Sequence, residues 1–177
     1  MSIIARVKKG DEEAFAKLIE EYKIPIYKTA KAILKDEDDV CDAIQDTALS
    51  IYKNINSLKN EKYFKTWVIR ITINKCYDII TKHRLREEKI SKVQANITEL
   101  HTNFVNNVIE KTDLERTLDL LEKDLKIVAV LYYYNDLSVS EISEILKIPK
   151  GTVKSRVFRA REKLYDILSK EEVGTIE

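Results

Sequence analysis

Apolar residues recur at helical spacing along most of the chain, most clearly between Ser138 and Leu168. Ile142, Ile145 and Leu146 fall at i, i+3 and i+4, which is one face of a helix. A second helix follows a tight turn and carries one apolar stripe, formed by Val153, Val157, Ala160, Leu164 and Leu168. This stretch therefore predicts two short helices joined by a turn.

Local signals mark the ends of these two helices. Ser138 and Glu141 have the spacing of a capping box, in which each side chain bonds the backbone of the other. Pro149 suits the first position of the second helix, where its missing N–H is not needed. The remaining faces of that helix are basic, with one acid, Glu162, among Lys150, Lys154, Arg156, Arg159, Arg161 and Lys163. The pattern is typical of a helix-turn-helix that enters the major groove, and a solvated basic face of an ordinary bundle is the alternative.

The N-terminal half predicts three more amphipathic helices. Asp11 caps the first, and Pro25 starts a second that covers Ile26 to Leu34. A third covers residues 38–55, with a core stripe of Val40, Ile44, Ala48, Ile51 and Ile55. A polar loop, Asn54 to Tyr63, then leads into an apolar segment that ends at Arg84. The core stripe of this segment starts with Phe64, Trp67, Val68 and Ile71.

The fold class follows from these helices and from the scarcity of turn residues. Residues 85–112 are rich in Asn and Thr without a sustained period, so we expect a linker there. Asp113–Leu121 and Asp124–Tyr134 predict further short helices, the latter built on Leu125, Val128, Ala129 and Tyr132. The 3 glycines and 2 prolines are few for a β-rich fold. We expect an all-α protein of two small helical domains, 1–84 and 113–177, joined by a linker, with a helix-turn-helix in the second.

Charge is segregated along the chain although its total is nearly balanced. The net charge is +1, from 31 basic and 30 acidic residues. Residues 36–46 hold six acids and no base, whereas residues 150–163 are strongly basic. One surface for an electropositive partner and another for DNA would produce this pattern. An ordinary amphipathic helix with a wet acidic face is the alternative for the first segment.

Several function classes are not expected from the sequence. Cys41, Cys76, His83 and His101 lack the close spacings of structural zinc sites, and two cysteines suggest no disulfide framework. Neither a glycine-rich phosphate loop nor a nucleophile with its base stands out. We therefore expect no metal, no cofactor and no enzymatic activity. The chain also lacks an apolar run of membrane-spanning length and a signal-peptide core, which favours a cytoplasmic protein.

Three motifs resemble one family. Gly151 to Leu164 resembles the promoter-reading helix of bacterial sigma factors of the extracytoplasmic-function type. Asp42 to Leu49 resembles the segment with which those proteins grip the clamp helices of RNA polymerase. Trp67, Arg70, Ile71, Asn74 and Asp78 fit the family's strand-opening segment. Two departures stand out: Ala48 replaces a usual aromatic residue, and residues 120–123 lack the proline that commonly follows a leucine pair.

The resemblance implies a function and a set of site residues. Core RNA polymerase would be bound by Asp42, Gln45, Asp46 and Leu49. The −10 promoter element would be captured by Asn56, Ser57, Lys59, Asn60, Tyr63, Lys65, Arg70, Asn74 and Tyr77. For Phe64 and Trp67 we expect instead an ordinary core position, as their apolar spacing indicates. The −35 element would be read by Lys150, Thr152, Lys154, Ser155, Arg156, Arg159 and Arg161.

The implied protein is a sigma factor that directs promoter-specific transcription initiation in a stress or envelope response. Its implied partners are core RNA polymerase, promoter DNA and an anti-sigma factor, without insertion of the chain into a membrane. Two alternatives stay open. One is a stand-alone helix-turn-helix regulator, which would bind DNA without polymerase. The other is a helical adaptor without promoter preference.

Overall fold

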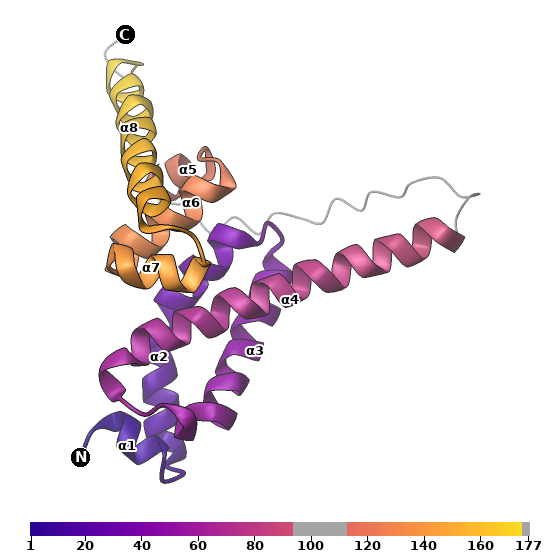
Figure 1. Cartoon of the computed structure of the whole chain (residues 1–177), viewed down its shortest axis with the longest axis vertical. Coiled ribbons are helices and arrows are strands. Elements are labelled where there is room, and N and C mark those ends of the chain that lie inside the picture. The colour runs from indigo at the N-terminus through magenta and orange to yellow at the C-terminus, as the bar shows by residue number, and fades with distance from the viewer. Residues whose placement is uncertain (94–112, 175–177) are drawn as a thin grey trace.

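The computed structural model describes residues 1–93 and 113–174, and every regular element in those two ranges is helical. Elements α1 to α4 belong to the first range and α5 to α8 to the second (Figure 1). The expected all-α class and the expected pair of helical domains are confirmed. The C-terminal domain packs against the N-terminal one, and α4 and α8 extend past the packed body (Figure 1).

The first two helices begin at side-chain caps. Ser2 accepts a hydrogen bond from the Ala5 N–H at the start of α1 (Ile3–Val7), a helix that the sequence reading missed. Asp11 caps α2 (Glu12–Ile33) by accepting from the Ala14 N–H, as predicted. That backbone bond, together with the nearby Arg6 guanidinium, lowers the pKa of Asp11.

Helix α2 passes through Pro25 without a break, so the prediction that Pro25 starts a separate helix is wrong. Proline inside a helix removes one backbone hydrogen bond and crowds the preceding turn. Tertiary packing outweighs that cost, because both flanks of Pro25 are buried: Leu18 and Ile26 in one core cluster, Ala30 in the other. In the second half of α2, Ile26, Ala30 and Ile33 are buried.

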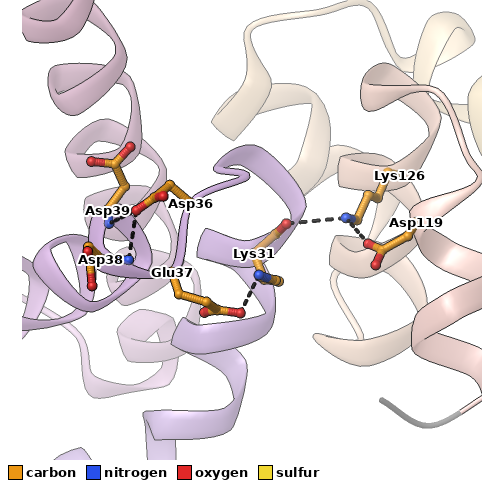
Figure 2. Close-up of polar contacts among 7 residues, drawn as sticks. All are labelled: Lys31, Asp36, Glu37, Asp38, Asp39, Asp119 and Lys126. Atoms are coloured by element: carbon orange, nitrogen blue, oxygen red, sulfur yellow. Dashed lines mark hydrogen bonds and ion pairs between the residues drawn. The ribbon is translucent and has the colours of Figure 1, made fainter. Parts of the chain in front are cut away.

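Helix α3 (Glu37–Asn54) begins where Asp36 accepts from the N–H groups of Asp38 and Asp39, as Figure 2 shows. Its buried residues are Val40, Ala43, Thr47 and Ile51. The predicted stripe was therefore partly wrong, since Ile44 and Ala48 are only half-buried. The polar Thr47 can occupy the core because its hydroxyl donates to the Ala43 carbonyl at 2.6 Å.

Two 3₁₀ turns, η1 (Ile55–Ser57) and η2 (Glu61–Tyr63), form the polar loop before α4 (Phe64–Val93). Buried Ile55 and Leu58 anchor this loop, and Lys8 donates to the Leu58 carbonyl at 2.6 Å. Helix α4 continues beyond residue 84, so the segment expected as linker begins inside a helix. The rest of that segment, residues 94–112, lies outside the described residues.

The C-terminal domain consists of α5 (Asp113–Asp119), α6 (Lys123–Ala129), η3 (Val130–Tyr134), α7 (Val139–Leu146) and α8 (Lys150–Gly174). The bend between α5 and α6 forms without the family's proline. Residues 124–134 were predicted as one helix, but the backbone widens into a π-helical turn at η3. Tyr132, predicted to face the core, is 37% exposed there.

The helix-turn-helix is formed by α7 and α8. The predicted capping box is present, and Ile142 and Ile145 are buried. Lys147 ends α7 in the left-handed conformation, with φ of 54°. Pro149 precedes the first residue of α8, and its carbonyl accepts from the Val153 N–H. The apolar stripe of α8 holds at Val153 and Ala160, but its last member, Leu168, is exposed because α8 runs past the packed body.

The two domains share one hydrophobic cluster. Ala30, Ile33 and Val40 of the N-terminal domain belong to the same buried cluster as Leu121 and Val128 of the other. A polar contact lies at its edge: Lys126 donates to the Lys31 carbonyl at 3.3 Å and pairs with Asp119 at 2.6 Å (Figure 2). A second cluster, which includes Leu18, Ile51 and Phe64, lies wholly within the N-terminal domain.

Candidate nucleic-acid and protein interfaces

The acidic segment presents a face of α3 that the core does not use. Asp42, Gln45 and Leu49 are exposed and Asp46 is half-buried, whereas Val40 and the other core residues lie on the opposite side. Leu49 is 50% exposed and adds an apolar side chain to this face. The structure thus brings the four predicted polymerase contacts onto one continuous surface.

Basic groups of α4 border this acidic face. Asp39, Asp42 and Asp46 line a shallow hollow of about 330 Å³ together with Lys82 and His83. His83 Nε2 lies 3.0 Å from an Asp39 carboxylate oxygen. The negative charge of these acids is therefore partly balanced within the domain. An electropositive partner would contact the carboxylates nearest the outer surface.

A larger hollow lies between the end of α3, η1 and α4. It has a volume of about 580 Å³, and the residues that line it include three of the predicted −10 contacts, Ser57, Asn74 and Tyr77. Trp67 also lines this hollow and is only half-buried. It is therefore not the ordinary core residue that the sequence predicted. An indole, a phenol and an amide around one hollow are groups that stack on and hydrogen-bond to an unpaired base.

Two further residues of this hollow, Ser50 and Asn54, were missed by the sequence reading. Their i, i+4 spacing on the α3 pattern is the signal that could have found them. Asn54 Nδ2 donates to the Ser50 carbonyl at 2.9 Å, which fixes the amide at the rim.

The remaining −10 residues lie on two other surfaces. Asn56, Lys59, Asn60 and Tyr63 are exposed on the loop, where Asn60 accepts from the Lys62 N–H. Lys65 and Arg70 lie on α4 and face acids of the C-terminal domain. Lys65 Nζ is 3.8 Å from an Asp136 oxygen, and Arg70 is 3.9 Å from Glu144. The predicted set is therefore divided among a hollow, a loop and a domain contact.

Helix α8 exposes most of the predicted −35 contacts. Lys150, Lys154, Ser155, Arg159 and Arg161 are exposed, and Thr152 is half-buried. The buried Val153 and Ala160 turn the opposite side of the helix into the domain. The arrangement leaves a basic helical face that an approaching duplex can reach.

Two basic side chains of α8 are held by acids of their own domain. Arg156 is half-buried and forms an ion pair with Asp124 of α6, a partner that no sequence spacing indicated. Lys163 donates to Glu122 at 2.6 Å, and that hydrogen bond lowers the pKa of the Glu122 carboxyl. The first pair orients the guanidinium near the start of α8, where a recognition helix meets base edges.

Within residues 1–93 and 113–174, no three His, Cys, Asp or Glu side chains come together as a group that could hold a metal ion. The helices described there are also too short or too polar to cross a lipid bilayer.

Two family models match this chain. Residues 18–86 match the family model for Sigma-70 region 2, and residues 111–164 match that for Sigma-70, region 4. The ECF RNA polymerase sigma factor SigW of Bacillus subtilis is 34% identical over 172 residues, which is 91% of this chain and 92% of the relative. The ECF RNA polymerase sigma-E factor of Haemophilus influenzae is 32% identical over 174 residues, covering 91% and 90% of the two chains.

Solved structures share the fold. CnrH, solved in complex with the cytosolic domain of CnrY, aligns with a TM-score of 0.62 at 23% identity and covers 95% of this chain and 96% of its own. The sigma factor RpoE of Bartonella quintana, solved with the anti-sigma factor NepR, aligns with a TM-score of 0.64 at 23% identity, over 86% and 97%. With both sigma regions matched in order and relatives alike over nine-tenths of the chain, this protein belongs to the extracytoplasmic-function sigma factors, non-enzymatic subunits that direct RNA polymerase to promoters.

Proposed function

We propose that the acidic face of α3 docks on core RNA polymerase while the basic face of α8 reads the −35 element in duplex DNA. The observation that carries this proposal is the separation of exposed charge: carboxylates on one helix and guanidinium and ammonium groups on another, neither needed for the core. Complementary potentials of this kind steer two different partners to two different surfaces.

The −10 element is captured at the hollow between the end of α3, η1 and α4. An unpaired base enters the hollow lined by Trp67, Asn74 and Tyr77, and the loop from Asn56 to Tyr63 contributes to the choice of base. Extruding a base costs a few kcal/mol, and stacking on an aromatic ring returns about 1–3 kcal/mol per base. Lys65 and Arg70 of α4 neutralise phosphates of the same strand.

Regulation by an anti-sigma factor is part of the proposal. The sigma factor RpoE of Bartonella quintana was solved with an anti-sigma factor, and CnrH was solved with the cytosolic domain of CnrY. The protein acts in the cytoplasm, where polymerase and promoter DNA are found.

The decisive experiment is reconstitution with purified core polymerase and a promoter template. We expect the chain to copurify with core polymerase and to support transcription that depends on both promoter elements. Promoter binding by the chain alone, as a dimer on a palindrome, would instead support the stand-alone regulator. Polymerase binding without any promoter preference would support the adaptor.

The −10 assignment has its own test. Asn74→Ala removes an amide from the hollow. We expect Asn74→Ala to reduce transcription from the native −10 sequence about fivefold or more, with −35 dependence unchanged, because one lost base contact costs about 1–3 kcal/mol and about 1.4 kcal/mol is a factor of ten. Equal activity of Asn74→Ala and the parent would exclude the hollow as the base site.

A further inference from the structure

The polar loop between α3 and α4 is tied at its middle to the first helix of the chain. Lys8 directly follows α1, and its ammonium group donates a hydrogen bond to the Leu58 carbonyl at 2.6 Å. The two residues are 50 positions apart in the sequence. Figure 1 shows α1 at the same end of the N-terminal domain as the connection between α3 and α4. An element outside every proposed contact with DNA or polymerase thus reaches the loop that contributes to the choice of a −10 base.

The middle of this loop belongs to neither of its two 3₁₀ turns. Residues 58–60 follow η1, which ends at Ser57, and precede η2, which begins at Glu61. The Leu58 N–H bonds the Ile55 carbonyl within the loop, at 3.2 Å. The Leu58 carbonyl is therefore the backbone group by which another element holds this stretch. A segment with few backbone hydrogen bonds of its own opens locally at low cost unless such a hold is present.

Helix α1 is packed firmly enough for Lys8 to act as a fixed donor. Val7 is 5% exposed and belongs to the same apolar cluster as Leu58. Arg6 pairs at 2.8 Å with Asp11, the cap of α2, which holds the turn between the two helices. Lys8 is itself half-buried, unlike a lysine that extends into solvent. The position of its ammonium group is therefore set by its packed surroundings.

We propose that Lys8 is a positioning residue for −10 recognition, which rests on the proposed role of this loop in base choice. It holds the Leu58 backbone, and through that backbone it sets the directions of the exposed side chains on either side, Asn56 and Asn60. A binding site discriminates between ligands only when its polar groups are held to within about 0.5 Å of the productive geometry. Base selectivity at the −10 element thus depends on a residue that contacts no base.

Two other roles for Lys8 make different predictions. A lysine that contacts a DNA phosphate weakens binding uniformly across sequences when it is removed, and the salt dependence becomes less steep. A lysine that only stabilises the fold lowers activity on every template alike. A positioning residue changes the ratio between templates that differ in one −10 base, because it acts through the groups that read that base.

The test uses Lys8→Met, Lys8→Arg and Lys9→Met in the full-length chain. Methionine keeps an unbranched apolar stem but has no ammonium group, whereas arginine keeps both the charge and hydrogen-bond donors. Lys9→Met makes the same charge change at the exposed neighbouring position and serves as the matched control. Circular dichroism checks that all three variants fold.

The first readout is amide hydrogen exchange of the loop, measured by NMR on the protein alone. The Leu58 and Tyr63 N–H groups bond to carbonyls within the loop, so their exchange reports its opening. We expect exchange of these amides in Lys8→Met to be about tenfold or more faster than in the parent, because a hydrogen bond from a charged group is lost. Lys9→Met should exchange like the parent.

The second readout is transcription with core polymerase from templates randomised at the −10 positions, with the −35 element constant. In Lys8→Met the preference for the parent's best base should shrink by about fivefold or more at one −10 position, which is the lower end of what a base contact contributes. The −35 preference should not change. Lys8→Arg should restore much of the −10 preference, and Lys9→Met should match the parent.

Other outcomes would overturn the proposal. Unchanged exchange of the loop amides in Lys8→Met would show that the bond to Leu58 does not hold the loop. Faster exchange with an unchanged base preference would show that the held conformation does not select the base. Equal loss on every template would make Lys8 a phosphate contact if the salt dependence also falls, and a stabilising residue if it does not. Failure of the proposed function looks different, because the parent chain would then show no −10-dependent transcription at all, whatever the exchange rates.

Discussion

Glu141 has two structural tasks that meet at one carboxylate. It closes the capping box of α7 by accepting from Ser138, and it accepts from Thr66 across the domain contact. The hydrogen bond from Thr66, followed by those from Ser138, lowers the pKa of Glu141 below its usual 4.5. A lowered pKa in the folded state means that the ionised carboxylate stabilises the fold.

This predicts a specific pH dependence. The stabilisation is complete above pH 4.5 and is lost as the pH falls through the lowered pKa of the folded state. In Thr66→Val the largest cause disappears, so we expect the Glu141 pKa to rise toward its usual value, measured by carbon-13 NMR titration of the carboxyl. The Glu122 carboxyl serves as internal control, because its partner Lys163 belongs to the same C-terminal domain and Thr66 does not contact it. An unchanged Glu141 titration in Thr66→Val would show that the two domains do not meet at this point in solution.

Arg156 and Lys150 should respond differently to alanine substitution. Arg156 is oriented by Asp124 near the start of α8, so Arg156→Ala should weaken −35 duplex binding by about 1–3 kcal/mol and relax base preference at one position. Lys150 is exposed at the helix start and suits a phosphate, so Lys150→Ala should weaken binding uniformly and reduce the salt slope by about one. Anisotropy titrations over a salt series measure both. Identical effects of the two substitutions would contradict the groove orientation.

Helix α3 separates its two tasks by face. Its core contacts use Val40, Ala43 and Ile51, which leaves Asp42 and Gln45 to solvent. The half-buried Asp46 lies at the border of the hollow that Lys82 and His83 complete. An element built in this way can lose a surface charge without losing its place in the fold.

Asp46→Arg should therefore weaken binding to core polymerase by tenfold or more while the helix content is retained. Truncating or reversing an interfacial charge can cost about 2–5 kcal/mol, and about 1.4 kcal/mol is a factor of ten. Glu20→Arg, an equal charge reversal on the exposed surface of α2, is the matched control. Pull-down titration with core polymerase gives the affinities. A folded Asp46→Arg variant with parental affinity would remove α3 from the polymerase interface.

The shared cluster makes the two domains energetically dependent on each other. Ile142 is fully buried in α7 and belongs to that cluster, whereas Trp67, the only tryptophan, reports on the N-terminal domain. A contact that joins two folding units transmits the loss of stability from one to the other.

Ile142→Ala should destabilise the C-terminal domain by about 2–5 kcal/mol, as large-to-small core substitutions do. We expect the midpoint of the urea transition monitored by Trp67 fluorescence to fall as well, because the N-terminal domain loses the share of its stability that the domain contact supplies. Thr29→Val removes the hydroxyl that accepts a hydrogen bond from the buried Asn135 amide across the domain contact. In that background the second shift should shrink, because the contact is already weakened. A Trp67 transition that ignores Ile142→Ala in the parent background would mean that the domains unfold independently.

The sequence by itself determined most of the helix starts of this protein and indicated its family. Caps at Asp11 and Ser138, the helical period and the segregated charge are encoded within a few residues of each other, so spacing alone reveals them. The three motifs between Asp42 and Leu164 likewise carried the resemblance to sigma factors. These are short-range signals, and they predicted the acidic face of α3 and the basic face of α8.

Only the tertiary structure decided how these elements use their residues. Packing on both sides of Pro25 kept α2 whole against local propensity, and the closeness of α3 to α4 turned Trp67 from a core residue into part of a hollow. The pairs Arg156–Asp124 and Thr29–Asn135 join residues far apart in the chain. Such contacts depend on how the amphipathic faces of the helices dock. That docking is decided by the total free energy of burying apolar side chains from distant parts of the chain, which no local sequence pattern contains.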